Sequence, residues 1–206
     1  DRAQLSNMAL QAKEAIACVE LAVVADRGYF NGEEILACEE ASITAYVPKT
    51  QTSNNQARGL FGRRDFIYRA DDNEYECPAG ERLIYRFTTQ DKGKTVHRYW
   101  SSACPRCRLK KQCTTAVYRR VKRWEHEAVM EAMEDRVDRM PDCMRIRGST
   151  VEHPFGTIKS WMGPVHFLMR RLEHVSTEMS LHVLSYNLKR MLQIMGVGPL
   201  IAAIRG

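Results

Sequence analysis

The sequence lacks a hydrophobic run long enough to cross a membrane. Its 206 residues are 44% apolar and 27% charged, and no uninterrupted apolar stretch approaches the roughly 18–20 residues that a membrane-spanning helix needs. The N-terminal residues also lack the pattern of a secretory signal peptide. These absences favour a cytoplasmic globular protein that has no membrane partner.

Acidic residues are almost absent from residues 82–123. This segment holds thirteen Lys or Arg residues against one acid, Asp91, so it carries +12 while the rest of the chain carries −6. A solvated face of mixed sign is the alternative interpretation, but so little acid favours a polyanionic partner, because Lys and Arg release the counterions of phosphates. We therefore expect contacts with nucleic acid from Lys110, Lys111, Arg120, Lys122 and Arg123.

Aromatic residues are interleaved with these charges. They are Tyr85, Phe87, Tyr99, Trp100 and Tyr118. Such side chains can stack on bases, but in a small β-rich module they often form the core, and the sequence leaves both interpretations open.

The cysteines do not favour disulfide pairing, because their number is seven and a cytoplasmic protein is kept reduced. Cys18, Cys38 and Cys143 are isolated and are expected to behave as small buried hydrophobes. The other four are Cys77 and the group Cys104-x2-Cys107-x5-Cys113. Cysteines two residues apart can bind one tetrahedral Zn²⁺, so we predict a structural zinc site, with His97 as a possible substitute ligand.

Residues 1–48 have the pattern of an α/β unit. Apolar spacing predicts a helix over residues 1–17 that Asp1 caps, and a buried strand follows over residues 21–25. Asn31 with Glu34 forms a capping-box pattern for a helix that runs to Glu39, and a second strand is expected over residues 43–48. Helix, strand, helix and strand in this order are typical of α/β architecture.

The pattern changes at residue 49. Residues 49–123 begin with a polar linker and continue as short strands, so they read as a basic, cysteine-containing β-rich module. Residues 124–206 are predicted to be helical, with one helix that starts at Trp124 and stops before Pro141. A second helix is expected over residues 176–196 and ends at Gly196.

Two acids occupy positions where a functional group is expected. Asp26 follows the first strand, and ligands of open α/β sheets bind beyond the carboxyl ends of strands. A tight turn with Gly28 is the alternative. Glu152 lies seven residues before Lys159, so both would project from one helical face, although Ser149 and Glu152 also form a capping-box pattern.

Several segments resemble the C-terminal portion of a bacterial insertion-sequence transposase of the DDE type. They are "VVADRGYFNGEEILACEE", "YECPAGERLIYRFTT", "SSACPRCRLKKQC", "RIRGSTVEHPFGTIKSWMG" and "TEMSLHVLSYNLKRM", which together extend along essentially the whole chain. The resemblance implies an α/β fold that is a partial ribonuclease H-like domain. Its N-terminal strands would be missing, and the cysteine module would be inserted before the C-terminal helices.

The resemblance also implies a catalytic site. Asp26 would be the second and Glu152 the third of three acids that hold Mg²⁺ or Mn²⁺, and Lys159 would contact the DNA backbone. Relatives usually carry an arginine at the position of Gly148. Here Arg145 and Arg147 lie nearby, and we expect both of them to contact DNA as well. The implied activity is metal-dependent cleavage and transfer of DNA strands at insertion-sequence ends.

Double-stranded DNA and a second copy of the chain are the implied partners in an active complex. The family's first aspartate would lie upstream of Asp1, so we expect the chain to be inactive by itself. Two alternatives remain, a noncatalytic zinc-containing DNA-binding protein derived from a transposase and an RNA-binding zinc-ribbon protein.

Overall fold

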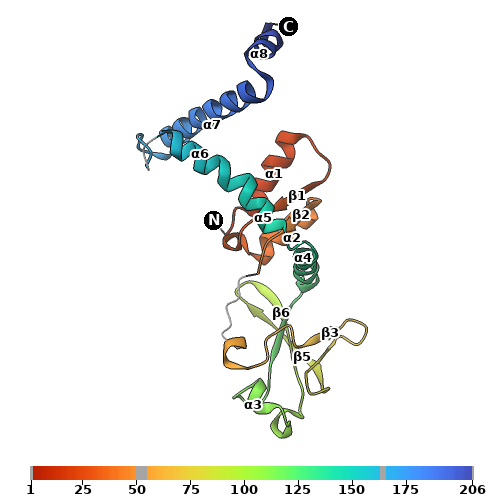
Figure 1. Ribbon diagram of the computed structural model, residues 1–206. Coiled ribbons are helices and arrows are strands. Elements are labelled where there is room, and N and C mark those ends of the chain that lie inside the picture. The colour runs from red at the N-terminus through yellow and green to blue at the C-terminus, as the bar shows by residue number, and fades with distance from the viewer. Residues whose placement is uncertain (1, 50–54, 163–165, 206) are drawn as a thin grey trace. The chain divides into compact units, whose positions relative to one another are not determined.

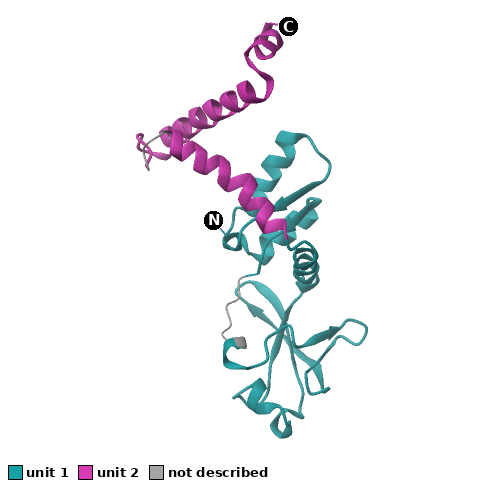
Figure 2. Ribbon diagram, viewed as in Figure 1, with its two compact units in different colours: residues 1–141 teal, residues 142–206 magenta. Residues whose placement is uncertain are grey.

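The computed structural model describes residues 2–49, 55–162 and 166–205. The chain divides into two compact units, residues 1–141 and residues 142–206 (Figure 2). Asp1, which the sequence suggested as a helix cap, and residues 50–54 of the predicted linker lie outside the described residues. Each unit is described by itself.

The first unit opens with the predicted α/β order (Figure 1). Its elements are α1 (Leu5–Ile16), β1 (Leu21–Val24), the 3₁₀ turn η1 (Arg27–Tyr29), α2 (Gly32–Glu40) and β2 (Ile43–Tyr46). β1 and β2 pair in parallel, with Leu21 opposite Ile43 and Val24 opposite Tyr46. The prediction of helix, strand, helix and strand is confirmed.

Local hydrogen bonds explain where these helices begin. The side chain of Asn31 caps α2 by accepting from the backbone N–H of Glu33 at 3.1 Å, as its capping pattern predicted. Glu34 does not complete the capping box among the described residues. Its carboxylate instead accepts from the backbone N–H and the hydroxyl of Ser6 at 2.9 and 2.7 Å. Gln4 stands at the N-cap of α1 and makes no side-chain capping bond.

The core of this α/β part includes a helix from much later in the chain. Ile35 and Ile43 are almost fully buried, and Met130 and Met133 of α4 (Glu127–Arg139) pack into the same cluster. Burial of each such side chain contributes about 1.5–3 kcal/mol. The helix predicted to start at Trp124 thus begins at Glu127, because Trp124 instead pairs with Val96 at the end of a strand.

Residues 55–124, the β-rich module, form an antiparallel sheet. Its strands follow one another in chain order as β3 (Ile67–Arg69), β4 (Glu74–Glu76), β5 (Arg82–Asp91), β6 (Lys94–Trp100) and β7 (Val121–Trp124). Short turns complete the module, namely η2 (Gln56–Arg58), η3 (Cys104–Arg106) and α3 (Lys110–Cys113). The fold is therefore mixed α/β, as the sequence predicted.

The β-rich module has a hydrophobic core of its own. Phe66, Tyr75, Leu83, Tyr99 and Val121 are buried together. The rings of Tyr75 and Tyr99 meet edge to face with their centroids 5.2 Å apart, a favourable geometry for aromatic pairs. Tyr99, one of the aromatic residues with two open interpretations, is thus a core residue.

The second unit, residues 142–206, is the helical unit. Its elements are α5 (Cys143–Arg147), the π-helical turn η4 (Gly148–Glu152), α6 (His153–Met162), α7 (Leu172–Met195) and α8 (Val197–Arg205). α7 contains the predicted last helix, which ends at Gly196 with a positive φ of 81°. The capping box predicted at Ser149 is wrong, because its hydroxyl donates to the carbonyl of Ile146 at 2.9 Å inside a continuing helix.

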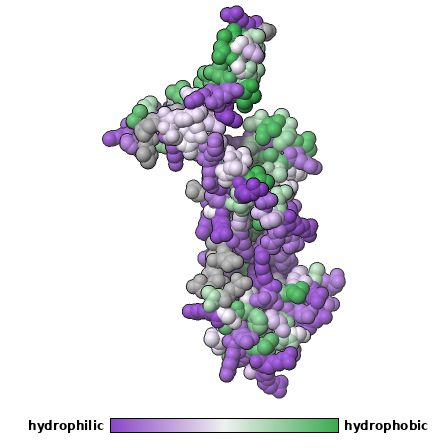
Figure 3. All heavy atoms as spheres, viewed as in Figure 1, coloured by the Kyte–Doolittle hydropathy of each residue, from purple (hydrophilic) through white to green (hydrophobic). Residues whose placement is uncertain are grey.

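Apolar side chains of the helical unit are widely exposed. Leu172 is 86%, Ile194 73% and Ile204 75% exposed, and hydrophobic atoms cover much of α8 in Figure 3. Among the residues that the structure describes, no helix combines the length and the hydrophobicity of a bilayer span.

Candidate functional site

Asp26 lies directly after β1, at the carboxyl end of a parallel strand. One oxygen, Oδ1, accepts a hydrogen bond from the backbone N–H of Gly28 at 2.8 Å and caps the turn η1. A Cβ at position 28 would lie 2.9 Å from this oxygen, so any other residue there would force the Asp26 side chain to shift. The turn interpretation of Asp26 is therefore correct, and the carboxylate is still only partly buried.

Glu152 lies in the helical unit at the end of the π turn η4. Its side chain is 71% exposed, and Oε1 accepts from Nη1 of Arg147 at 3.2 Å. A π turn closes between residues five apart, and Arg147 precedes Glu152 by five residues. Because of the π turn, Arg147 lies on the same face of the helix as Glu152. In a regular α-helix, two residues that are five positions apart would lie on different faces.

Sequence reasoning did not foresee this ion pair. Arg147 and Glu152 are both visible in the sequence, but no sequence pattern separates a π turn from an α turn. Arg145 instead pairs with Asp142 at 3.1 Å, and both side chains are largely exposed.

Lys159 lies on α6, which continues without a break from the π turn that ends at Glu152. Its side chain is exposed, and none of the ion pairs between described residues includes it. Asp26 belongs to the first unit and Glu152 to the second.

The basic residues predicted to contact DNA have different environments in the β-rich module. Arg123 is buried, donates to Glu131 at 2.9 Å and stacks on Tyr68 with its guanidinium carbon 3.7 Å from the ring centroid. Burial alone would lower the pKa of Arg123, but its hydrogen bonds to Glu131 and Tyr75 raise it. Arg123 thus has a structural role, and we leave it out of the proposed DNA surface.

The other predicted basic residues are more accessible. Lys122 is exposed and binds Asp91 at 2.9 Å, which lowers the pKa of that carboxyl group. Lys110 and Lys111 belong to α3, where Nζ of Lys110 lies 3.5 Å from the carbonyl of Val117. Arg120 is exposed, and its guanidinium carbon lies 5.6 Å from the centroid of the Trp100 ring.

Sequence reasoning missed the role of Arg86. Its guanidinium carbon lies 5.2 Å from the same Trp100 ring, and it donates to the carbonyl of Trp100 at 3.3 Å and to Ser102 at 3.0 Å. Phe87 also contacts Trp100, with ring centroids 5.8 Å apart. We call these four residues, Arg86, Phe87, Trp100 and Arg120, the arginine–tryptophan face.

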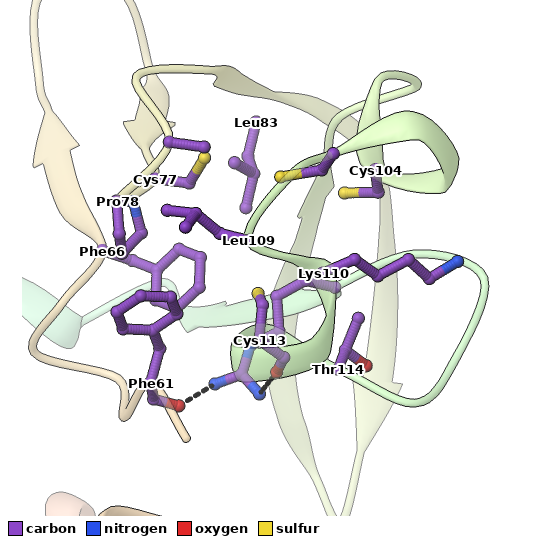
Figure 4. A pocket seen from close by; sticks show the side chains of 13 residues that line it. Phe61, Phe66, Cys77, Pro78, Leu83, Cys104, Leu109, Lys110, Cys113 and Thr114 are labelled. Atoms are coloured by element: carbon purple, nitrogen blue, oxygen red, sulfur yellow. Dashed lines mark hydrogen bonds between the residues drawn. The ribbon is translucent and has the colours of Figure 1, made fainter. Parts of the chain in front are cut away.

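The four clustered cysteines line one small cavity of the β-rich module (Figure 4). Cys77 follows β4, whereas Cys104, Cys107 and Cys113 come from the η3–α3 segment, and the cavity has a volume of about 20 Å³. All four thiols are free and half-buried. Burial raises the pKa of Cys113, the charge of Arg119 opposes this shift, and the three other thiols add to it.

The four cysteines that the spacing grouped together thus line one cavity, and their role as zinc ligands stays a prediction. They do not form a finished coordination shell, since no group of three or more His, Cys, Asp or Glu side chains among the described residues is arranged to hold a metal ion. His97 lies elsewhere, on β6, where Nδ1 is 2.8 Å from the hydroxyl of Thr88. Cys38 and Cys143 are buried and Cys18 is half-buried.

Comparison with known proteins gives one finding. A family model described as transposase DDE domain matches residues 76–192, which is more than half of the chain. The match includes Glu152, Lys159 and the four cavity cysteines, whereas Asp26 precedes it. Comparisons with curated proteins and with solved structures give no match.

Proposed function

Because this chain belongs to the transposase DDE domain family, we propose that it is the part of a DNA transposase that supplies two of three catalytic acids, Asp26 and Glu152. The α/β part with β1, β2 and α4 would be a partial ribonuclease H-like core, into which the β-rich module is inserted. The family match through Glu152 and Lys159 is the observation that carries this proposal.

The positions of the two acids support their proposed roles. Asp26 lies at the carboxyl end of a parallel strand, where ligands of open α/β sheets bind. Glu152 is exposed and is oriented by Arg147, whose side chain is only 18% exposed. Neither carboxylate is sealed under apolar side chains, so both remain accessible as the hard oxygen ligands that Mg²⁺ and Mn²⁺ prefer.

The residues of the site would divide the work. Asp26 and Glu152 would hold Mg²⁺ or Mn²⁺. When bound, such ions activate a water or a 3′-hydroxyl and stabilise the leaving oxygen of a phosphodiester during cleavage and strand transfer. Arg147 would keep Glu152 in place, and Lys159, about two turns further along the helix, would bind a DNA phosphate.

We propose that the chain alone does not cleave DNA, because among its described residues no group of three or more His, Cys, Asp or Glu side chains is arranged to hold a metal ion. A noncatalytic zinc-containing DNA-binding protein is the alternative. Cleavage of a duplex with the ends of the encoding element, by this chain and Mg²⁺ alone, would contradict the first proposal. DNA binding that is indifferent to Mg²⁺ would favour the alternative.

Iron-directed cleavage tests whether the two acids share a metal. Fe²⁺ replaces Mg²⁺ in the DNA-bound chain, and ascorbate with peroxide then cuts the polypeptide close to the bound ion. We expect cuts near residues 26 and 152, and Asp26→Asn or Glu152→Gln should each weaken both cuts. Asp71→Asn, at an exposed acid of the β-rich module, is the matched control. Cuts at one position only would end the proposal.

We propose that the arginine–tryptophan face is part of the DNA-binding surface. Arg86 and Arg120 lie over one ring, so their charges are positioned by stacking. None of the ion pairs among described residues includes either arginine, and their charges are therefore available to phosphates. Lys110, Lys111 and Lys122 would extend this surface.

Salt titration of duplex binding tests this surface. Each phosphate contact contributes about 0.9 to the slope of log affinity against log salt concentration. Arg86→Ala and Arg120→Ala should each reduce the slope by about 1, whereas Arg69→Ala, which removes a partner of Glu76, should not. An unchanged slope in both face variants would exclude the surface, and stronger binding of single-stranded RNA would favour the RNA-binding alternative.

A homodimer in the active complex is also proposed, on the family resemblance alone. Sedimentation of the DNA-bound chain would measure the number of protein copies in the complex. One copy per duplex end, with no association between protein copies, would contradict the homodimer.

We further propose a structural Zn²⁺ in the cavity of Cys77, Cys104, Cys107 and Cys113. Support comes from four free thiols in one small cavity and from the match between four sulfur ligands and tetrahedral zinc. The thiols would have to move closer to form the shell. Such coupling of metal binding to local folding is common in small zinc modules.

Elemental analysis of protein purified under reducing conditions tests the zinc proposal. We expect about one zinc per chain, loss of zinc in Cys104→Ser and Cys113→Ser, and no loss in Cys143→Ser, which changes a buried cysteine of the other unit. Wild-type protein that is metal-free and unaffected by chelators would contradict a zinc site.

A further inference from the structure

Arg119 lines the cysteine cavity and carries a buried polar atom that is not satisfied. Among the described residues, Nε of Arg119 is the buried side-chain nitrogen or oxygen atom without a hydrogen-bond partner. Buried donors are almost always paired, and an unpaired one costs about 1–3 kcal/mol. Such an atom needs a physical explanation.

The other two nitrogens of the guanidinium group make long hydrogen bonds to backbone carbonyls. Nη1 donates to the carbonyl of Cys113 at 3.5 Å and Nη2 to the carbonyl of Phe61 at 3.4 Å, as the dashed lines in Figure 4 show. The guanidinium carbon lies 5.0 Å from the centroid of the Phe66 ring. No ion pair among the described residues includes Arg119, so no carboxylate neutralises this half-buried cation there.

A thiolate metal site would supply the missing anion. Four cysteine thiolates around one divalent zinc ion leave a net charge of −2, and that charge would stand in an apolar cavity. A buried charge is costly unless it is paired and hydrogen-bonded. Two cationic residues, Lys110 and Arg119, line this cavity, and Arg119 donates to the backbone carbonyl of Cys113.

We propose that Arg119 is the positioning cation of the cysteine site, with its Nε–H as the donor to a ligand thiolate. This inference rests on the proposed zinc site and adds a residue that no cysteine spacing could identify. A hydrogen bond from outside the ligand shell favours the deprotonated ligand, and loss of such a partner typically weakens metal affinity about 10–100-fold.

Metal titration of the full chain tests the role of Arg119. Co²⁺ and Zn²⁺ are added to the reduced, metal-free protein, and affinity is measured by competition with a chromogenic chelator. Arg119→Gln should weaken both metals about 10–100-fold, with the sulfur-to-cobalt absorption bands unchanged because the four ligands remain. Arg120→Gln is the matched control, since this exposed neighbour stacks on Trp100, and it should leave metal affinity unchanged.

The pH dependence separates positioning from simple structural support. Removing a cation disfavours the thiolate, so the pH at which half of the sites hold Co²⁺ should rise in Arg119→Gln. Arg119→Lys keeps the charge without the Nε–H and should give an intermediate value. If Arg119 only supports the loop, its variants lower the melting temperature of the metal-free protein and leave this pH unchanged, which overturns the inference.

The possible failures are distinguishable. Wild-type protein that binds neither metal overturns the zinc proposal and the role of Arg119 together. Wild-type protein that binds metal, with equal affinity and pH dependence in both Arg119 variants, overturns the role of Arg119 alone.

Discussion

The β-rich module and the helical unit bury their apolar side chains to very different extents. The module closes a core around Tyr75, Leu83 and Tyr99, each no more than 2% exposed. The helical unit exposes most of its large apolar residues and still carries Glu152 and Lys159. The tightly packed core of the module and the proposed functional residues Glu152 and Lys159 therefore lie in different parts of the chain, whereas Asp26 belongs to the first unit.

The largest expected difference concerns leucine truncation. Leu83→Ala removes a side chain that is 1% exposed and should lower the free energy of unfolding of the module by about 2–5 kcal/mol. Leu184→Ala in α7, at a residue that is 63% exposed, should change stability by no more than about 0.5 kcal/mol. Urea unfolding followed by near-ultraviolet circular dichroism measures both. Equal losses would mean that this face of α7 is buried in solution.

Loss of an ion pair should likewise lower stability more in the β-rich module than in the helical unit. Glu131→Gln leaves Arg123, whose side chain is 9% exposed, without its carboxylate and should cost about 1–3 kcal/mol. Asp142→Asn removes a partner of Arg145 in a pair whose side chains are 65% and 76% exposed, and should cost less than about 0.5 kcal/mol. The same unfolding measurement applies, and a larger loss for Asp142→Asn would reverse the comparison.

The smallest expected effect is a local response to pH in the helical unit. Backbone N–H groups of Leu168 and Met169 donate to Glu178 at 3.0 and 2.9 Å and lower its pKa. The stabilisation of this turn is therefore complete above the unfolded pKa of about 4.3 and is lost as pH falls through the lower folded value.

Amide exchange at Leu168 and Met169, corrected for intrinsic rates, should accelerate on acidification towards pH 3. Glu178→Ala, which removes both acceptor oxygens, should make exchange fast at every pH, while Leu83 in the module is the internal control. Protection that does not depend on pH in the wild type would show that these hydrogen bonds do not hold the turn.

Periodicity and spacing predicted those parts of the molecule that local rules determine. The α/β order of the first unit was predicted from apolar runs and from the cap at Asn31. Cysteine spacing grouped Cys77 with Cys104, Cys107 and Cys113, which line one cavity. Both predictions depend on residue types that are found in few other structural environments.

Tertiary contacts decided what sequence patterns did not. Trp124 has helical spacing with the residues after it, yet pairing with Val96 holds it in a strand. Arg123 belongs to the most basic segment, but Glu131 of α4 neutralises it in a buried position. The partner of each is distant in sequence or belongs to another element, so a count of local charges or apolar positions does not reveal it.

The π turn at Gly148–Glu152 has a consequence for how this segment is read as a string of letters. A count of four residues per helical turn pairs Glu152 with Gly148, whereas the residue that reaches the carboxylate, at 3.2 Å, is Arg147. Functional alignment here should therefore compare side-chain directions, and the tally of intervening letters is secondary.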